Sequence, residues 1–320
     1  MKLRTFISIL LHLLGSIFLL AAVVLIAAWL TGIIFSDRWV WSQWLSWIPT
    51  IILMPAGGLW LIGIGLMRRF RRYWQPGICL LVLGPFVYLY LHWQPERTHA
   101  DESRPGITFC QWTLGTVLAN EEAYGEVLVE LDADVSLVEG GRRIRWSQPI
   151  KDWLGPEQTS LSTGIFSILT PLPVEELRTV VWAEGIYAAI LTINGPGFEV
   201  TPLKILLIDL PSDPNRSRWQ IAARLDDLLS KAEFDEPDLI VGDFNMPSNS
   251  RAFGGLFKGY TRAWSESGEG WGPTYPREWP IARIDHVLVG PTVDVTSIRT
   301  IDPGRGRHRL QVFKVTAGSE

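Results

Sequence analysis

An acid and an amide follow an apolar stretch in the C-terminal half of the chain. Residues 238–245, Asp-Leu-Ile-Val-Gly-Asp-Phe-Asn, predict a strand that runs into Asp243 and, two residues later, Asn245. A carboxylate at such a strand end can hold a cation or activate water, and a carboxamide can orient a phosphate or the nucleophile. Taken alone, Asp-Phe-Asn is also a common turn sequence, so this pair indicates chemistry only together with other residues.

Three further ionisable groups lie near predicted strand ends in the same half. Glu139 follows the apolar stretch 134–138, although an acid at a strand end usually just meets solvent. Asp285 belongs to Arg-Ile-Asp-His at 283–286, where a strand begins, and His308 shortly precedes the last predicted strand. An aspartate that orients a histidine is a common catalytic device. These groups together indicate acid–base or metal-assisted chemistry.

The elements that must position these groups follow from the distribution of apolar residues. The 320-residue chain is 47% hydrophobic and 19% charged, with a formal charge of −4 and 2 cysteines. This composition excludes a disordered chain and a disulfide scaffold, and it gives no general reason to expect a basic nucleic-acid surface. Cys79 and Cys110 lie in unlike parts of the sequence, so we expect no disulfide between them.

Three apolar runs in residues 1–95 are long enough to cross a bilayer as helices, which takes about 20 residues. They cover residues 6–35, 44–67 and 74–93. The first run exceeds the roughly 7–15 apolar residues of a signal peptide, so it predicts an uncleaved spanning helix. Prolines and glycines interrupt the second and third runs, but neighbouring helices can satisfy the backbone groups that such residues free.

Basic residues predict the orientation of these spans. Lys2 and Arg4 precede the first run, and four arginines within residues 68–72 separate the second run from the third. Because basic loops stay on the cytoplasmic side, the N-terminus is expected in the cytoplasm and everything after the third run outside it. We therefore expect a multi-pass protein of the cell (inner) membrane, with a linker at 96–105 and an extracytoplasmic domain at 106–316.

In residues 106–316 the expected strands outnumber the helices, and helices lie between strands. Strands are expected at 107–114, 134–138, 179–183, 187–193, 203–210, 239–241, 284–289 and 310–315, and helices over 219–231 and ending near 127–131. This pattern predicts an α+β fold in which two mainly β layers are flanked by helices, a four-layer α/β/β/α sandwich.

Taken together and in this order, the motifs resemble the endonuclease/exonuclease/phosphatase superfamily over about residues 107–315. The most specific parts are Gly-Asp-Phe-Asn at 242–245 and Arg-Ile-Asp-His at 283–286. The N-terminal spans and the aromatic-rich stretch 271–276 resemble a membrane-anchored bacterial subgroup of that superfamily.

The resemblance implies hydrolysis of phosphate esters by activated water with a metal ion. Glu139 matches the metal-binding glutamate of the family, and Asp243 matches the aspartate that positions the attacking water. Asn245 matches the residue that works with this aspartate and orients the phosphate. Asp285 matches the aspartate that orients the closing histidine, and His308 matches that histidine, which contacts the scissile phosphate. The implied cofactor is Mg²⁺, with Mn²⁺ or Ca²⁺ as alternatives.

Three positions depart from the family pattern. Thr113 stands where the family has asparagine, Asp209 where it has histidine or tyrosine, and Arg307 where it has the aspartate before the closing histidine. Since the last two changes are opposite in charge, we hypothesise that Asp209 and Arg307 form an ion pair across the cleft. Arginine also suits bidentate phosphate binding, so Arg307 is a candidate for a new substrate contact.

Two functions remain open at this point. One is an extracytoplasmic phosphoesterase anchored in the lipid bilayer, acting on a phosphodiester or phosphomonoester. Lipid-linked phosphates are among its candidate substrates, and extracellular nucleic acid is a less favoured one. The alternative is a catalytically degenerate member of the same fold that binds a ligand or partner at the membrane surface.

Overall fold

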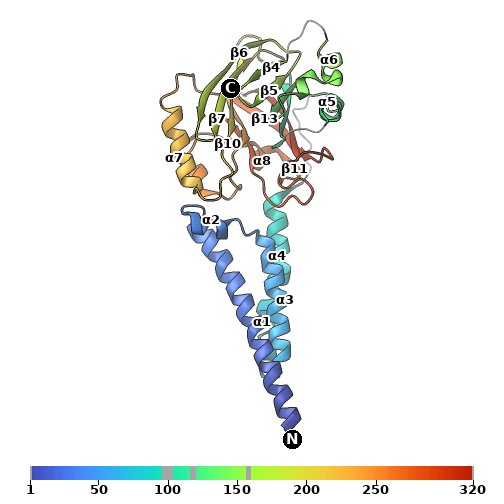
Figure 1. The fold of residues 1–320 in the computed structure, drawn as a ribbon, viewed down its shortest axis with the longest axis vertical. Coiled ribbons are helices and arrows are strands. Elements are labelled where there is room, and N and C mark those ends of the chain that lie inside the picture. Colours follow the sequence, from blue (N-terminus) through green and yellow to red (C-terminus); the bar gives the residue numbers. More distant parts are fainter. Residues whose placement is uncertain (1, 96–103, 116–119, 156–159, 319–320) are drawn as a thin grey trace. The chain divides into compact units, whose positions relative to one another are not determined.

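A computed structural model describes residues 2–95, 104–115, 120–155 and 160–318, so most of the expected linker at 96–105 lies outside the described residues. The chain divides into two compact units (Figure 1). The first, here called the helical unit, contains Met1–His92, Pro214–Trp219 and Asn249–Arg251. The second, the sandwich unit, contains Trp93–Asp213, Gln220–Ser248 and Ala252–Glu320.

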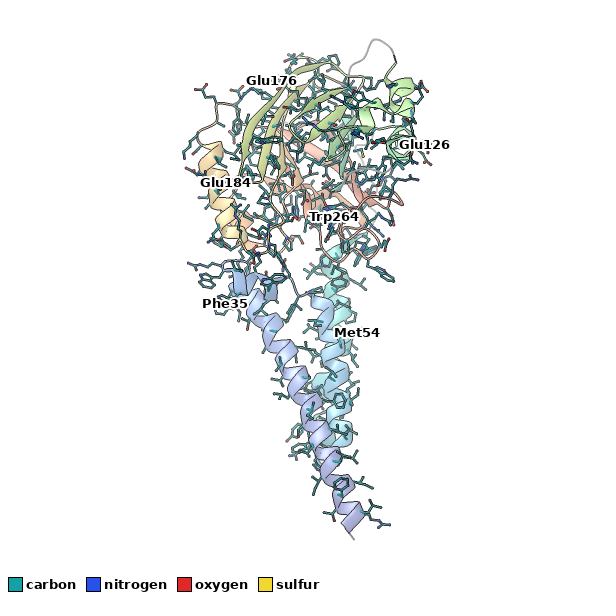
Figure 2. All side chains as sticks on the ribbon, viewed as in Figure 1. Phe35, Met54, Glu126, Glu176, Glu184 and Trp264 are labelled. Carbon is teal, nitrogen blue, oxygen red and sulfur yellow. The ribbon has the colours of Figure 1, made fainter. Side chains whose placement is uncertain are left out.

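The helical unit has four α-helices and two short 3-10 helices among the residues that the structure describes. They are α1 (Lys2–Phe35), α2 (Val40–Ser46), η1 (Thr50–Ile52), α3 (Leu53–Leu66), η2 (Arg68–Tyr73) and α4 (Gln75–His92). In the described chain, α1 and α4 are long and apolar enough to cross a membrane, and a third span results only if α2 and the bent segment Thr50–Leu66 count as one. Apolar side chains such as Phe35 and Met54 point outward and are 41% and 46% exposed (Figure 2). The long apolar N-terminal helix suggests a membrane anchor.

The helix expected over residues 44–67 is not continuous, which corrects that part of the prediction. α2 ends at Ser46, and the chain bends by 69° before it continues through η1 into α3. Pro49 lies at this break, with an extended backbone. Proline has no amide hydrogen to donate and disfavours the helical conformation in the residue before it, which favours a break at this point.

Glycines allow the helices of this unit to pack closely. A Cβ at Gly15 of α1 would lie 2.7 Å from the carbonyl oxygen of Gly63 in α3. One at Gly57 of α3 would lie 2.7 Å from the carbonyl oxygen of Gly77 in α4. Small residues at helix contacts are typical of membrane helices, because they let backbones approach where no water drives association.

Two buried polar side chains of the helical unit bind its loop segments. Gln43 of α2 donates from Nε2 to the carbonyl oxygen of Pro214 at 3.1 Å and accepts the amide of Arg218 at 3.0 Å. Asp37, in the turn before α2, accepts hydrogen bonds from the hydroxyls of Ser36 and Ser250. Both side chains are therefore satisfied by hydrogen bonds in the interior of the unit.

The sandwich unit is built on two sheets. One has the strand order β1-β11-β13-β14-β2-β3-β5-β4, and the other β10-β12-β9-β8-β7-β6. The strands of the larger sheet are β1 (Trp93–Gln94), β2 (Ile107–Thr113), β3 (Val135–Glu139), β4 (Leu161–Thr163), β5 (Phe166–Leu169), β11 (Gly268–Trp271), β13 (Val293–Ile301) and β14 (Leu310–Ala317). Those of the smaller sheet are β6 (Val174–Ala183), β7 (Ile186–Ile193), β8 (Leu203–Asp209), β9 (Leu239–Asp243), β10 (Thr261–Arg262) and β12 (Asp285–Val289). The remaining helices are α5 (Glu121–Glu130), η3 (Ile144–Trp146), α6 (Gln148–Leu154), α7 (Arg218–Leu229), η4 (Arg251–Gly254) and α8 (Ala263–Ser267).

Three buried apolar clusters hold these layers together. The first lies between the sheets and includes Phe109 of β2 and Ile205 of β8. The second packs Ile221 of α7 against the smaller sheet, and the third packs Leu128 of α5 and Ile150 of α6 against the larger sheet. Figure 1 shows α7 on one side of the sheets and α5 and α6 on the other. The α+β prediction with helices outside two β layers is confirmed.

Parallel strand pairs bring distant polar residues to one edge of the sandwich. β2 and β3 are parallel, with Thr113 opposite Glu139, and β8 and β9 are parallel, with Asp209 opposite Asp243. Parallel neighbours need a crossover connection, which α5 and α7 supply. β12 runs antiparallel to β9 and begins at Asp285, opposite Asp243. The carboxyl ends of β2, β3, β8 and β9 therefore meet the beginning of β12.

Candidate active site

A glycine allows Asp243 to reach the centre of this edge. Gly242 has a φ of 147°, and a Cβ there would lie 1.8 Å from the carbonyl oxygen of Ile208 and 2.8 Å from Oε1 of Glu139. Only glycine adopts this backbone conformation without strain and leaves that space open. β8, β9 and the Glu139 side chain can therefore approach one another next to Asp243.

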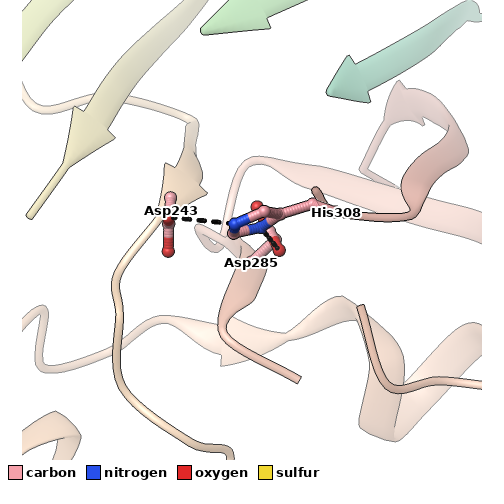
Figure 3. Close-up of side chains that lie close together, drawn as sticks. All are labelled: Asp243, Asp285 and His308. Carbon is pink, nitrogen blue, oxygen red and sulfur yellow. Dashed lines mark hydrogen bonds and ion pairs between the residues drawn. The ribbon is translucent and has the colours of Figure 1, made fainter. Parts of the chain in front are cut away.

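His308 lies between two carboxylates (Figure 3). Its Nδ1 is 2.9 Å from Oδ2 of Asp285, and its Nε2 is 4.0 Å from Oδ2 of Asp243. All three residues are buried: Asp285 is 0%, Asp243 4% and His308 6% exposed. Burial disfavours the imidazolium, but the charge and hydrogen bond of Asp285 and the charge of Asp243 outweigh it and raise the pKa of His308 to about 9. Without a metal ion, these two carboxylates therefore favour the protonated imidazole.

Asp285 is the hydrogen-bonding centre of the site. The hydroxyl of Thr113 donates to its Oδ1 at 2.7 Å, and Nε2 of Gln111 lies 3.4 Å from the same oxygen. Burial acts to raise the pKa of this carboxyl, but the charge of His308 and hydrogen bonds from His308, Thr274 and Thr113 oppose burial, and the pKa of Asp285 is lowered. Asp285 therefore remains ionised and holds His308 in one orientation.

Asn245 holds Asp243 in place. Its backbone amide donates to Oδ1 of Asp243 at 2.8 Å, and its side-chain Nδ2 lies 3.0 Å from Oδ2. The same Nδ2 donates to the carbonyl oxygen of Leu210 at 2.7 Å. A φ of 49° at Asn245 turns the chain back toward Asp243, a backbone conformation that asparagine tolerates better than most residues. In this structure Asn245 therefore acts on Asp243, and its amide hydrogens are directed to protein oxygens.

Glu139 adds a carboxylate from the other sheet. Its Oε2 lies 3.1 Å from the hydroxyl of Thr113, which also reaches Asp285. Burial, and then the charges of Asp209, Asp243 and Asp285, raise the pKa of Glu139. A threonine hydroxyl has one hydrogen, so Thr113 can donate to only one of its two carboxylate neighbours at a time.

Asp209 lies in the same row of strand-end carboxylates but does not pair with Arg307. Burial, and then the charge of Asp285, raise the pKa of Asp209 to about 7, against the opposing effect of His308. Among the described residues no ion pair joins Asp209 to Arg307, so that hypothesis was wrong. The Arg307 guanidinium instead lies over the ring of Tyr275 and donates from Nη2 to its hydroxyl at 3.2 Å. Arg307 belongs to the loop before β14, where strand alternation does not determine side-chain direction.

Three residues at the site were not candidates from sequence. Gln111 lies two positions before Thr113 on β2, and residues at this spacing share a face, so the alternation of the strand was an available signal. Tyr275 packs against His308 with ring centroids 4.9 Å apart and planes tilted by 50°. Thr274 accepts the backbone amides of Ile284 and Asp285 at 3.3 and 3.4 Å. The last two belong to the aromatic-rich stretch 271–276, which did not by itself indicate their positions.

The donor set fits a divalent cation. Ligand atoms of Asp243, Asp285 and His308 lie within 4.8 Å of one another, a group that could hold a metal ion. Glu139 is not part of that compact group, but its carboxylate and that of Asp209 face the same cluster. Four carboxylates around one imidazole leave excess negative charge that a cation would neutralise. Oxygen ligands of this kind suit Mg²⁺, Mn²⁺ and Ca²⁺.

The family of the chain is established by its sequence. The model of the endonuclease/exonuclease/phosphatase family matches residues 130–318, which is more than half of the 320 residues. The chain therefore belongs to this family, whose members are generally metal-dependent. No curated protein sequence gives a significant match.

Solved structures share the fold of the sandwich unit. An endonuclease/exonuclease/phosphatase from Bacteroides vulgatus is 12% identical, with a TM-score of 0.52 over 67% of this chain and 99% of that chain. A mannosyl-6-phosphatase from Bacteroides thetaiotaomicron is 11% identical, with a TM-score of 0.52 over 66% of this chain and 99% of that chain. A humanized D. rerio TDP2 is 16% identical, with a TM-score of 0.51 over 66% of this chain and 99% of that chain. At these identities the likeness shows the fold alone.

Proposed function

We propose that this protein is a membrane-anchored, extracytoplasmic phosphoesterase that hydrolyses phosphate esters with water and a divalent metal ion. The observation that carries the proposal is the position of His308, which bonds Asp285 at 2.9 Å on one side and lies 4.0 Å from Asp243 on the other. An imidazolium in this position can donate a hydrogen bond to a phosphate oxygen while the adjacent carboxylate accepts a proton from water. Membership of the family supports the same reaction class.

Each side chain of the site has a different proposed role in hydrolysis. Asp243 is the proposed general base, because burial and then the charge of Asp285 raise its pKa and so favour proton uptake from the attacking water. Asn245 keeps that carboxylate in place. His308 donates to a non-bridging phosphate oxygen, and Asp285 keeps its ring oriented and charged. Preorganised charges of this kind stabilise the transition state without rearranging during the reaction.

The proposed cofactor is Mg²⁺, with Mn²⁺ or Ca²⁺ as alternatives. Glu139 would be its carboxylate ligand, and the facing carboxylates of Asp243 and Asp285 would add negative charge around it. When bound, such an ion polarises a phosphoryl oxygen and stabilises the charge on the leaving oxygen. The excess of buried carboxylates over cations in this cluster supports the proposal.

The proposed location rests on the apolar helices and on the basic residues between them. α1 and α4 meet the length and hydropathy of membrane spans. The proposal counts the bent pair Val40–Ser46 and Thr50–Leu66 as a third crossing between them. With Lys2, Arg4 and the arginines of residues 68–72 on the cytoplasmic side, as the positive-inside rule favours, three crossings would put the sandwich unit outside. Fusing reporter enzymes after residue 95 tests this: a reporter active only outside the cytoplasm should work, and one active only inside should not.

The proposed substrate is a phosphate ester close to the membrane, with lipid-linked phosphates favoured and extracellular nucleic acid less favoured. A mannosyl-6-phosphatase has the same fold as the sandwich unit, so a sugar phosphate is a useful comparison substrate. A panel of one phospholipid, one sugar phosphate and one DNA oligonucleotide would separate these classes.

The deciding experiment measures turnover of that panel and of a generic phosphodiester and phosphomonoester by the full chain in detergent. Each substrate is tested with Mg²⁺, Mn²⁺ or Ca²⁺ and with a chelator. We expect metal-dependent release of phosphate or alcohol that is lost in Asp243→Ala. No turnover with any metal, equal in wild type and Asp243→Ala, would favour a binding module over an enzyme.

A further inference from the structure

Tyr275 covers one side of His308 in the candidate active site. The two rings lie 4.9 Å apart between centroids, with planes tilted by 50°. Tyr275 is partly exposed and Arg307 is exposed, whereas His308 is buried. The guanidinium of Arg307 lies 5.9 Å above the Tyr275 ring and donates to its hydroxyl at 3.2 Å. A tyrosine and an arginine therefore stand on the solvent side of the histidine proposed to contact the phosphate.

The backbone holds the tyrosine firmly. Tyr275 donates to the carbonyl oxygen of Ala282 at 2.9 Å and accepts the amide of Ala282 at 3.0 Å. The residue before it, Thr274, accepts the amide of Arg309 at 2.8 Å, one position after His308. The segments that carry Tyr275 and His308 are thus joined by hydrogen bonds. These backbone hydrogen bonds fix the spacing of the two segments whose rings are in contact.

Arg307 and Tyr275 both keep hydrogens that are not used in the hydrogen bond between them. The tyrosine hydroxyl accepts from Arg307, so its own hydrogen can be donated to a third group. Within the described chain Tyr275 makes no other side-chain hydrogen bond, and no acid lies within ion-pair distance of Arg307. The charge of Arg307 also acts on His308, where it opposes protonation of the imidazole. The Tyr275 hydroxyl and the Arg307 guanidinium therefore lie together beside the His308 ring, and both have hydrogens available for an anion.

The strand that ends beside Asp243 lacks a donor for phosphate. β8 ends at Asp209, whose carboxylate, when ionised, repels a phosphate instead of donating to it. A second donor to the phosphate, besides His308, would therefore have to come from another element. Tyr275, from the loop between β11 and β12, is adjacent to His308 and supplies one.

We propose that Tyr275, with its hydroxyl oriented by Arg307, donates a hydrogen bond to a non-bridging oxygen of the substrate phosphate next to His308. This inference rests on the proposed phosphoesterase function and adds a phosphate-binding residue to it. Tyr275 contacts the phosphate, and Arg307 acts both on the Tyr275 hydroxyl and by adding positive charge.

The test compares Tyr275→Phe with wild type in the full chain in detergent. Phenylalanine keeps the ring on His308 and removes only the hydroxyl. A hydrogen bond to a charged group is worth enough that kcat/KM should fall about 10- to 100-fold, and the inhibition constant of inorganic phosphate should rise by a similar factor. Because Arg307 acts partly through the same hydroxyl, Arg307→Met should cost much less in the Tyr275→Phe background than in wild type.

Tyr124→Phe is the matched control. Arg305 lies 5.8 Å above the Tyr124 ring, but that ring packs on Trp112 at 5.3 Å and not on His308. Its kinetics and phosphate inhibition should equal those of wild type, and the thermal midpoints of all variants should agree. Equal phosphate inhibition in Tyr275→Phe and wild type would overturn the inference.

If the wild type shows no turnover with any metal, the proposed function fails but the phosphate site is still testable. Calorimetry with inorganic phosphate and Mg²⁺ should then show weaker binding to Tyr275→Phe than to wild type. Equal affinity in both proteins, or no phosphate binding to either, would contradict a phosphate-binding role for Tyr275.

Discussion

Buried polar side chains occur in both units, but they are paired in different ways. In the helical unit Gln43 is 0% and Asp37 1% exposed, and both bind amide, carbonyl or hydroxyl groups. In the sandwich unit the buried carboxylates of Glu139, Asp243 and Asp285 face one another around a single imidazole. Hydrogen bonds to neutral groups offset the desolvation free energy of a buried polar side chain. Carboxylates that face one another instead add electrostatic repulsion to that free energy.

This difference indicates which buried groups serve structure and which serve chemistry. A satisfied buried group stabilises its fold and gains nothing from a ligand. A cluster of carboxylates with perturbed pKa values is unfavourable by itself and becomes favourable when a cation binds. The sandwich unit therefore retains an arrangement that costs stability, as expected for a functional site. The following predictions test that contrast from the largest effect to the smallest.

Replacing Asp243 should separate activity from stability most strongly. In Asp243→Asn the proposed base is lost but the shape is kept, so kcat should fall by roughly 10²- to 10⁴-fold, the usual contribution of a general base. Removing one of several facing charges should leave the metal-free thermal midpoint equal or higher. Steady-state kinetics and thermal unfolding measure both effects. A variant that is less stable yet fully active would contradict the assignment of this carboxylate to chemistry.

Metal-free protein should lose stability as the pH rises. The folded-state pKa of Asp209 is about 7, above its ordinary 3.8. Its contribution to folding stability is therefore fully present below about pH 4 and is lost as the pH rises through 7. Its full size is at most about 4 kcal/mol. The contribution of His308, whose pKa rises from 6.5 to about 9, is present below 6.5 and lost through 9.

Thermal midpoints in chelator from pH 5 to 9 check this pH dependence. Mg²⁺ should flatten the profile, because the cation stabilises the ionised carboxylates. Asp209→Asn should remove the loss of stability that the wild type shows between pH 5 and 7 and keep the loss near pH 9. A chelated wild type whose stability rises steadily from pH 5 to 9 would show that the carboxylates are not mutually repulsive.

Asp285→Asn should change the charge of His308. Without the Asp285 carboxylate the pKa of His308 should fall from about 9 toward its ordinary 6.5, since this carboxylate is the largest cause that raises it. Above pH 7 the imidazole then loses its proton, and kcat/KM should fall about 100-fold, with the alkaline limb of the pH–rate profile shifted to lower pH. Asp227→Asn, a surface ion-pair residue of α7, is the control. An unmoved alkaline limb in Asp285→Asn would exclude His308 as the group titrating there.

Gln43→Leu should affect stability but not chemistry. The change removes two hydrogen bonds of the helical unit and leaves the amide of Arg218 and the carbonyl of Pro214 without this partner, at a cost of about 1–3 kcal/mol. Thermal unfolding in detergent should show the loss, while kcat and KM at a temperature well below the midpoint stay at wild-type values. A change in kcat would mean that the hydrogen bonds of Gln43 are coupled to catalysis.

Much of the sandwich unit followed from local sequence pattern. The strand predictions at 134–138 and 284–289 agree with β3 and β12 to within a residue at each end, because apolar runs bounded by turn residues are a short-range signal. One helix was expected over 44–67, but the chain bends by 69° between α2 and Thr50–Leu66, next to Pro49, and average hydropathy does not register such a break. The Asp209–Arg307 pair failed because a loop side chain has no periodic direction.

The sequence by itself determined the kinds of groups available: an apolar N-terminal part, strand ends that carry Glu139, Asp243 and Asp285, and a late histidine. These depend on composition and on periodicity over a few residues. Only the tertiary structure decided that these strand ends meet, that His308 bonds Asp285 at 2.9 Å, and that the ring of Tyr275 packs against the imidazole. The pairing of strands far apart in the chain depends on register and crossover packing, which no local pattern specifies.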